Sequence, residues 1–194
     1  MGTRGLMGVR VDGIDKFMYN HFDSYPSGLG ADIVDDINEL LDTPGLGLGG
    51  IKTLAQKLEL VDRDSKPTPE QQKKFIKYFD SGVASRSTND WYCLLREMQG
   101  KFAETLQAGV AIDYTDFIKE SLFCEWAYVV NFDTNMFEVY KGFQERPHTN
   151  GRYSSMTVSE EAPSKRFYPC ALVAEFPLTE IPKDWHKRVS KDYE

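Results

Sequence analysis

The chain has 194 residues, 41% of them hydrophobic and 13% aromatic, which is enough to bury one core without help from disulfides or metal ions. Its formal net charge of −7 argues against a general nucleic-acid binder, because that class of protein needs a basic face. No apolar run approaches the roughly 18 residues that a membrane-spanning helix needs, so we do not expect a membrane protein.

The N-terminal segment has the pattern of a β-hairpin. Residues 3–11 predict a strand, Asp12-Gly13 is a dipeptide typical of hairpin turns, and residues 16–22 predict the return strand. Residues 23–28 form a cluster of turn-favouring residues after that strand, and a helix is expected to begin near Ala31.

The middle of the chain is predicted to be mainly helical. After the first helix and a Gly-rich connection over residues 43–50, apolar residues from Ile51 to Val61 predict a second helix. Thr68 to Gln71 has the sequence of a capping box that starts a third helix. The buried face of this third helix is predicted to comprise Phe75, Ile76 and Phe79.

The longest predicted helix spans residues 89–106, where apolar side chains recur at offsets of three and four. We interpret this stripe as core, because an aromatic stripe at helical spacing is more often core than a cofactor site. A shorter helical segment is expected over residues 114–122.

The C-terminal third changes to the period of strands. Residues 125–132 and 136–140 predict a second hairpin, residues 168–176 a further strand, and residues 142–166 a long loop between them. A turn at residues 182–185 is expected before a charged tail.

This order of elements predicts an α+β fold in a single domain over residues 1–194. The N-terminal hairpin and the C-terminal strands would share a mostly antiparallel sheet, with the central helices packed on one face.

Cysteine and histidine usage predicts a cytoplasmic protein without a metal or other cofactor. Cys93, Cys124 and Cys170 are far apart in apolar surroundings, which is typical of buried free thiols in a reducing compartment. The N-terminus has no apolar stretch of the kind found in signal peptides. The histidines and cysteines show no zinc-ligand spacing, and the glycines at 45–50 lack the context of a phosphate-binding loop.

The exit of the second strand is the most promising place for a site. His21, Asp23 and Tyr25 alternate there, and a histidine, a carboxylate and a phenol can transfer protons or bind a polar ligand. The following helix start, preceded by Gly28 and Gly30, can take an anion. The alternative is a structural turn in which Asp23 caps backbone amides and Tyr25 packs in the core.

A second polar cluster lies on the long loop and comprises Arg146, His148, Asn150 and Arg152. These side chains would either close over a site or belong to a solvated loop.

The N-terminal residues Met1-Gly2-Thr3-Arg4 and the segment from Phe22 to Gly30 resemble a family found in phages, bacteria and fungi. Its members open with Met-Gly-Thr-Arg and later carry an aromatic-Asp-Gly/Ser-Tyr-Pro-x-Gly-x-Gly element. The hairpin at residues 126–133 resembles that family more loosely. The family has no known activity, so the resemblance implies candidate positions and no mechanism.

These observations favour a ligand-binding or protein-interaction protein with a site at the end of the N-terminal hairpin. The expected ligand-binding residues are Arg4, Asp23, Tyr25, Gly28 and Gly30. The partner, a small molecule or a protein, is not identified by the sequence, and nucleic acid is not expected.

The alternative hypothesis is a hydrolase in which His21 and Asp23 do the acid–base work and Arg4 holds an anionic group. Its architecture would be similar to that of N-terminal nucleophile hydrolases of the choloylglycine type, with Thr3 in the place of the nucleophile. A free amino group on Thr3 would require removal of the two preceding residues. A third hypothesis, a phage counter-defence factor, comes from the resemblance and the acidic charge.

Overall fold

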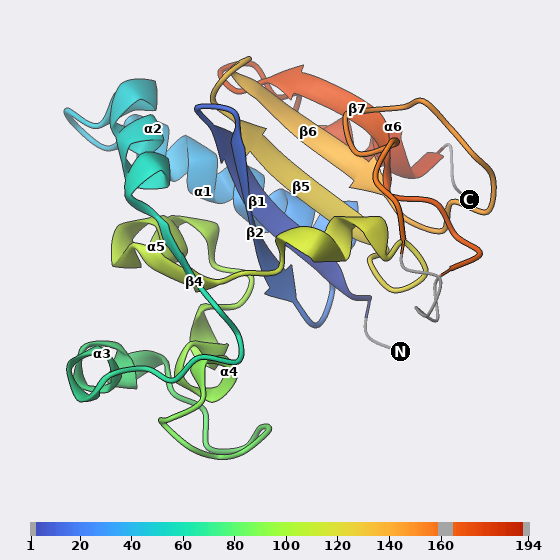
Figure 1. The fold of residues 1–194 in the computed structure, drawn as a ribbon. Helices are drawn as coiled ribbons and strands as arrows, with labels where there is room; N and C mark the ends of the chain where they lie inside the picture. The colour runs from blue at the N-terminus through green and yellow to red at the C-terminus, as the bar shows by residue number, and fades with distance from the viewer. Residues whose placement is uncertain (1–2, 159–164, 192–194) are drawn as a thin grey trace.

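The computed structural model describes residues 3–158 and 165–191 (Figure 1). The strands are β1 Gly5–Val11, β2 Ile14–Asn20, β3 Glu59–Val61, β4 Val110–Ile112, β5 Trp126–Asn131, β6 Met136–Lys141 and β7 Ala171–Pro177. The α-helices are α1 Ala31–Asp42, α2 Gly47–Lys57, α3 Pro69–Phe75, α4 Trp91–Leu94, α5 Phe102–Ala108 and α6 Trp185–Lys191. Shorter helical turns are η1 Pro26–Gly30, η2 Ile76–Tyr78, η3 Arg96–Met98 and η4 Thr115–Lys119.

The main sheet has five strands in the order β2-β1-β5-β6-β7. The two predicted hairpins are present, and the N-terminal strand β1 lies inside the sheet, antiparallel to β2 and parallel to β5. All other neighbours in this sheet are antiparallel. The predicted α+β class, with a mostly antiparallel sheet shared by the N-terminal hairpin and the C-terminal strands, is therefore confirmed.

The closed ends of the two hairpins are joined. Asp12 and Gly13 both have positive φ (53° and 78°), the conformation that a tight hairpin turn requires. The carboxylate of Asp133, in the turn of the other hairpin, accepts hydrogen bonds from both turn amides, at 2.8 Å and 2.9 Å. This contact fixes how the N-terminal hairpin is aligned along the rest of the sheet.

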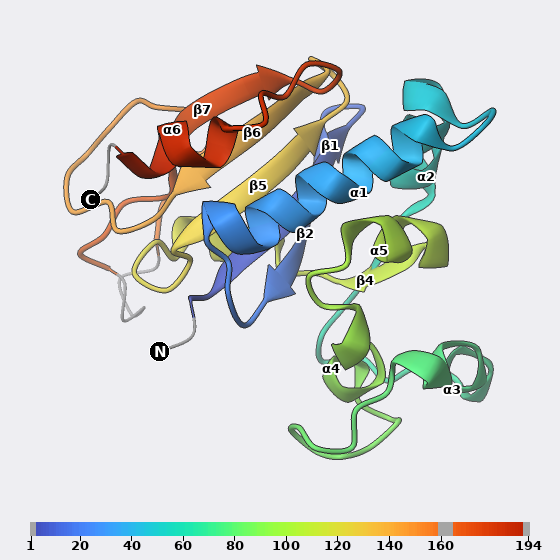
Figure 2. The same cartoon turned by 180° about the vertical axis from the view of Figure 1, so that it is seen from behind.

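Helices cover one face of the sheet, as the sequence predicts (Figure 2). Along β5, Trp126, Tyr128 and Val130 face the helical side and belong to the larger core cluster, which includes residues of α1, α2, α5 and α6. Ala127 and Val129 face the opposite side and belong to a second cluster. The period-2 alternation of a two-sided buried strand accounts for this division.

The opposite face is covered by η4 and by the long loop after β6 (Figure 1). Arg152 of this loop donates to both carboxylate oxygens of Glu138 on β6 (2.8 and 2.6 Å) and also pairs with Asp15 at 3.3 Å. Asp15 is in turn paired with Arg10 at 2.9 Å. Arg152 is therefore an anchor that holds the loop on the sheet, rather than a solvated loop residue.

Replacing Arg152 tests this anchor. Arg152→Gln leaves the buried carboxylate of Glu138 without its cation, so we expect the free energy of unfolding to fall by about 3 kcal/mol. Arg146→Gln, an exposed arginine of the same loop, is the matched control and should change stability by less than about 0.5 kcal/mol. Urea unfolding measures both, and equal effects of the two substitutions would remove the anchoring role.

An outer lobe, residues 59–98 together with β4, lies beyond the edge of the main sheet. It has its own core cluster, which includes Phe75, Trp91 and Leu94, and a two-stranded parallel sheet of β3 and β4. Figures 1 and 2 show α3 and α4 well away from the main sheet. The predicted capping box is present, since the Thr68 hydroxyl accepts from the Gln71 amide and the Gln71 side chain accepts from the Thr68 amide.

The predicted helix over residues 89–106 is wrong as a continuous element. The chain forms α4, η3 and α5 instead, with Leu95 outside helical geometry (φ −108°, ψ 14°) and Gly100 at φ 82°. The apolar stripe is nevertheless buried, because Trp91 packs in the outer lobe and Phe102 packs in the main core. An apolar period of 3.6 therefore predicts burial here, although the helix breaks first at Leu95 and again at Gly100.

Other boundaries also differ from the prediction. The predicted second helix ends early, because Val61 belongs to β3, and Gly47 to Gly50 lie inside α2 instead of the connection. Ile76 is 51% exposed instead of buried. The predicted turn at residues 182–185 is present, with the Trp185 amide donating to the Pro182 carbonyl at 3.0 Å, and helix α6 occupies the region where a tail is predicted. Cys93, Cys124 and Cys170 are buried free thiols, as predicted.

Candidate functional site

A cleft of about 1210 Å³ lies at the open end of the N-terminal hairpin. Three parts of the chain line it: the hairpin ends, the outer lobe near residues 60–64 and 92, and the segment over residues 113–123. The hairpin contributes Arg4, which precedes β1, together with Tyr19 and His21 at the end of β2. A concave surface therefore lies at the end of the hairpin, where the sequence predicts a site.

Half-buried aromatic rings line much of this cleft. Tyr19 stacks on Tyr114, with ring centroids 5.1 Å apart and planes at 29°, and meets the edge of Phe117 at 5.5 Å. The backbone of Phe17 holds Tyr114 in place, since its carbonyl accepts from the Tyr114 amide at 3.0 Å. The full aromatic set is Tyr19, His21, Tyr92, Tyr114, Phe117 and Phe123.

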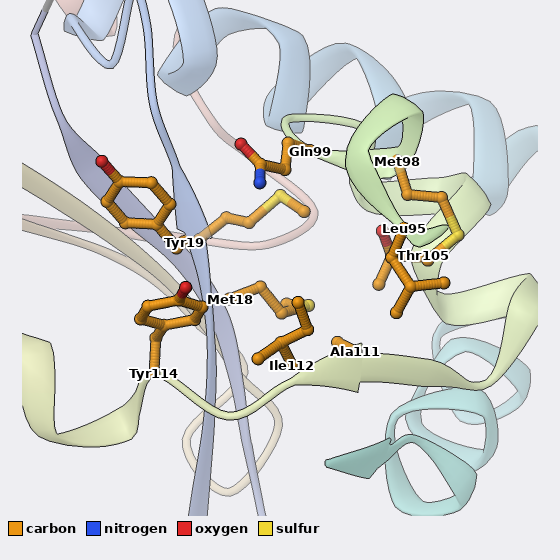
Figure 3. Close-up of a pocket in the computed structure, with 10 residues that line it drawn as sticks. Met18, Tyr19, Leu95, Met98, Gln99, Thr105, Ala111, Ile112 and Tyr114 are labelled. Atoms are coloured by element: carbon orange, nitrogen blue, oxygen red, sulfur yellow. The ribbon is translucent and has the colours of Figure 1, made fainter. Parts of the chain in front are cut away.

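Tyr19 and Tyr114 also form a wall of a small inner cavity of about 30 Å³ (Figure 3). Figure 3 shows the two phenol rings side by side, with Met18 beside them and Met98 on the opposite side of the cavity. A volume of this size has room for about one water molecule.

A hydrogen bond of 2.7 Å joins the Tyr19 hydroxyl to Nδ1 of His21. Burial raises the pKa of Tyr19 to about 12, so the phenol keeps its proton at neutral pH. We assign the donor role to Tyr19, which places the proton of the neutral imidazole on Nε2. Burial, followed by the positive charges of Arg96 and Arg4, lowers the pKa of His21 below its usual value.

The carboxylates of the cleft lie on other segments, in the outer lobe and around η4. Asp62 and Asp113 each accept a hydrogen bond from the backbone amide two residues further on, at 2.8 Å. Asp116 pairs with Lys119 at 2.8 Å. These three acids therefore stabilise local turns. Asp64 and Glu120 also line the cleft, and Arg4 gives its hairpin side a positive charge.

The structure brings two of the predicted site residues, Arg4 and His21, together in the cleft. Asp23, Tyr25, Gly28 and Gly30 do not line it. Asp23 is exposed, and its backbone carbonyl, instead of its side chain, accepts the Leu29 amide at 2.9 Å. Tyr25 is 43% exposed, so it is not the core residue that the structural-turn alternative requires.

The glycines of this turn have a packing explanation. A Cβ at Gly28 would overlap the carbonyl of Asp23, and a Cβ at Gly30 would lie 2.7 Å from Trp185 and 2.8 Å from Tyr128. The amides of Gly28 and Gly30 both donate to the carbonyl of Tyr25, at 3.0 and 3.2 Å. Since these amides are already bonded within the turn, a ligand would have to displace the carbonyl. Ligand binding by the turn stays a prediction.

The polar cluster of the long loop does not reach the cleft. Arg146, His148, Asn150 and Arg152 are absent from its lining. Nε2 of His148 lies 2.7 Å from the carbonyl of Pro169, and the carbonyl of Asn150 accepts the Leu172 amide at 3.2 Å. These contacts tie the loop to the chain that leads into β7.

Three residues at the site were not singled out by the sequence: Arg96, Tyr92 and Tyr114. Each lies far from the hairpin along the chain, and no sequence pattern predicts that it packs beside the hairpin. Tyr19 carries a weak signal, because it alternates with His21 and so shares its side of β2.

Comparisons with known proteins leave the family resemblance a prediction: no protein-family model, curated protein or solved structure matches the chain. Within residues 3–158 and 165–191, no three His, Cys, Asp or Glu side chains gather closely enough to hold a metal ion. In the same part of the chain, no helix is both long enough and apolar enough to cross a membrane.

Two glycine substitutions test the packing role of the turn. Gly30→Ala should lower the free energy of unfolding by about 1–3 kcal/mol, because Trp185 and Tyr128 must move to admit the new methyl group. Gly49→Ala, in open space within α2, should instead raise stability by up to about 1 kcal/mol. Thermal and urea unfolding measure both. If Gly30→Ala left stability unchanged, packing would not explain this glycine.

The charges around His21 can be tested by NMR titration of its imidazole. We expect a pKa below the usual value, which rises in Arg96→Gln because one of the two depressing charges is lost. Arg96→Lys keeps the charge and should keep the pKa low. Arg63→Gln, on the other side of the cleft, is the control and should leave His21 unchanged. A His21 pKa that is insensitive to Arg96→Gln would contradict this electrostatic arrangement.

Proposed function

We propose that this chain is a binding protein that takes a small organic ligand in the cleft at the open end of the N-terminal hairpin. The observation that carries the proposal is the convergence of six half-buried aromatic rings, from three separate stretches of chain, on one cleft. Aromatic side chains are frequent in the lining of ligand sites. Charged side chains share the lining of this cleft: Arg4, Asp62, Arg63, Asp64, Asp113, Asp116, Lys119 and Glu120.

The chemistry of the lining favours a ligand with a flat or apolar part. Aromatic faces provide large contact area and bind rings by offset stacking or edge contacts. Tyr19 and Tyr114 already hold one another in place, so little side-chain entropy is lost when a ligand arrives. The volume of about 1210 Å³ lies just above the range of roughly 300–1,000 Å³ that is usual for such sites, so the ligand would be large or accompanied by water.

Binding is favoured over hydrolysis by the partner of His21. A His–Asp pair would need the carboxylate of Asp23 against the imidazole, whereas Nδ1 of His21 is bonded to Tyr19 and Asp23 does not line the cleft. A protein partner, a cytoplasmic location and a connection with phages stay predictions from the sequence.

An NMR screen with neutral aromatic compounds tests the proposal. We expect hits to shift the backbone amides of cleft residues, such as Tyr19 and Tyr114, and the shifts to saturate. Tyr92→Ser removes one ring and should weaken the hits about tenfold, since one aromatic contact is worth about 1.4 kcal/mol. Tyr168→Ser, outside the cleft, is the matched control.

Thermal unfolding of both variants shows whether they keep the fold. The proposal fails if the shifts scatter over the whole surface, if Tyr92→Ser binds as well as the unaltered protein, or if a bound compound is turned over.

A further inference from the structure

Two arginines beside the cleft form no ion pair with a carboxylate, which within residues 3–158 and 165–191 is also true of Arg86, Arg146 and Arg166 elsewhere in the chain. Arg10, Arg63, Arg152 and Arg188 each form an ion pair with a carboxylate. Among the described residues, no such pair is formed by Arg4 or by Arg96. Nη1 of Arg96 donates to the side-chain oxygen of Gln99, which is neutral, so the positive charges of Arg4 and Arg96 are both left for a ligand.

Aromatic rings hold both guanidinium groups in place. Arg4 lies over the ring of Phe123, at 4.9 Å from its centroid. Arg96 lies 5.6 Å from the ring centroid of Tyr92 and 5.7 Å from that of Phe22, which is itself in edge contact with His21 at 4.3 Å. A guanidinium stacked on a ring keeps N–H groups at its edge, and these groups match the geometry of an oxyanion.

The two charges act on the same pair of side chains. Arg4 lines the cleft with the hydrogen-bonded Tyr19–His21 pair, and Arg96 lies over Phe22, which contacts His21. Each charge lowers the pKa of His21 and opposes the rise in the pKa of Tyr19. In the part of the chain that the structure describes, neither guanidinium has a carboxylate within ion-pair distance, so a bound anion would gain from both positive charges.

We infer that the cleft's ligand carries an anionic group, such as a phosphate, sulfate or carboxylate, which Arg4 and Arg96 hold against Nε2 of His21. This inference rests on the proposed function and names the chemistry of one end of the ligand. The group is directed to Arg4 and His21 because the five acids of the cleft lie on the other segments: Asp62, Asp64, Asp113, Asp116 and Glu120. Arg96 lies beside the lining, next to Phe22 and Tyr92. The aromatic rings then receive the remainder of the ligand.

The test uses inorganic phosphate as the probe, with sodium chloride at the same ionic strength as the reference. The full-length protein is titrated at fixed pH, and imidazole resonances of His21, His148 and His186 are followed by NMR. We expect a saturable shift at His21 alone. Sulfate and acetate, titrated separately, compare the other oxyanions with phosphate.

Variants locate the site. Arg4→Gln and Arg96→Gln should each weaken phosphate binding about tenfold, as expected for loss of one charge-assisted contact. Lys119→Gln removes a cation of the same cleft that is already paired with Asp116, so it should change the affinity less than about twofold. Amide spectra of each variant report whether the fold is kept.

The inference is overturned if none of the three anions moves His21 beyond the chloride reference. It is also overturned if all three histidines shift together, or if Lys119→Gln weakens binding as much as Arg4→Gln. Saturable binding of neutral aromatic compounds without any anion effect would leave the proposed function standing and remove only this inference. Phosphate binding at His21 without aromatic hits would support the anion site and remove the proposal that the rings bind an aromatic ligand.

Discussion

The parallel pairing of β1 with β5 is the contact on which the rest of this structure depends. It joins Gly5 to Trp126 and Arg10 to Asn131, so the first strand of the chain enters the sheet interior between β2 and β5. Because β1 is an interior strand with a neighbour on each side, both ends of the N-terminal hairpin have fixed positions. The closed end is bonded to Asp133. At the open end, Arg4 and the end of β2 meet the outer lobe and the segment around η4, and the cleft forms there.

Much of the fold can be predicted from the sequence because its signals are local. Asp12-Gly13 sets a hairpin turn, and Thr68 to Gln71 form the capping box that their order predicts. What could not be predicted depends on distant contacts. Strands β3 and β4 have three residues each, too short for a period to distinguish strand from helix, and they are strands because they pair with one another. The break at Gly100 follows from a positive φ that an apolar stripe does not reveal.

The residues of the candidate site are likewise only partly predictable from the sequence. Arg4 and His21 can be selected from the sequence, and they do meet, because both flank strands of one hairpin. Arg96 and Tyr114 belong to stretches that only tertiary packing brings to the hairpin. The glycines of the N-terminal signature attract attention as a ligand site, yet Gly30 is needed where Trp185 and Tyr128 leave no room for a side chain. A distinctive turn thus supports the scaffold, while the cleft beside it offers the chemistry: stacked rings, a neutral imidazole and two arginines without acidic partners.

A crystal structure grown at neutral pH in inorganic phosphate tests this account most directly. The account predicts a phosphate in the cleft, with its oxygens within hydrogen-bonding distance of the guanidinium groups of Arg4 and Arg96 and of Nε2 of His21. A cleft without the anion, in which Arg4 or Arg96 turns away to pair with a carboxylate of the chain, would contradict it.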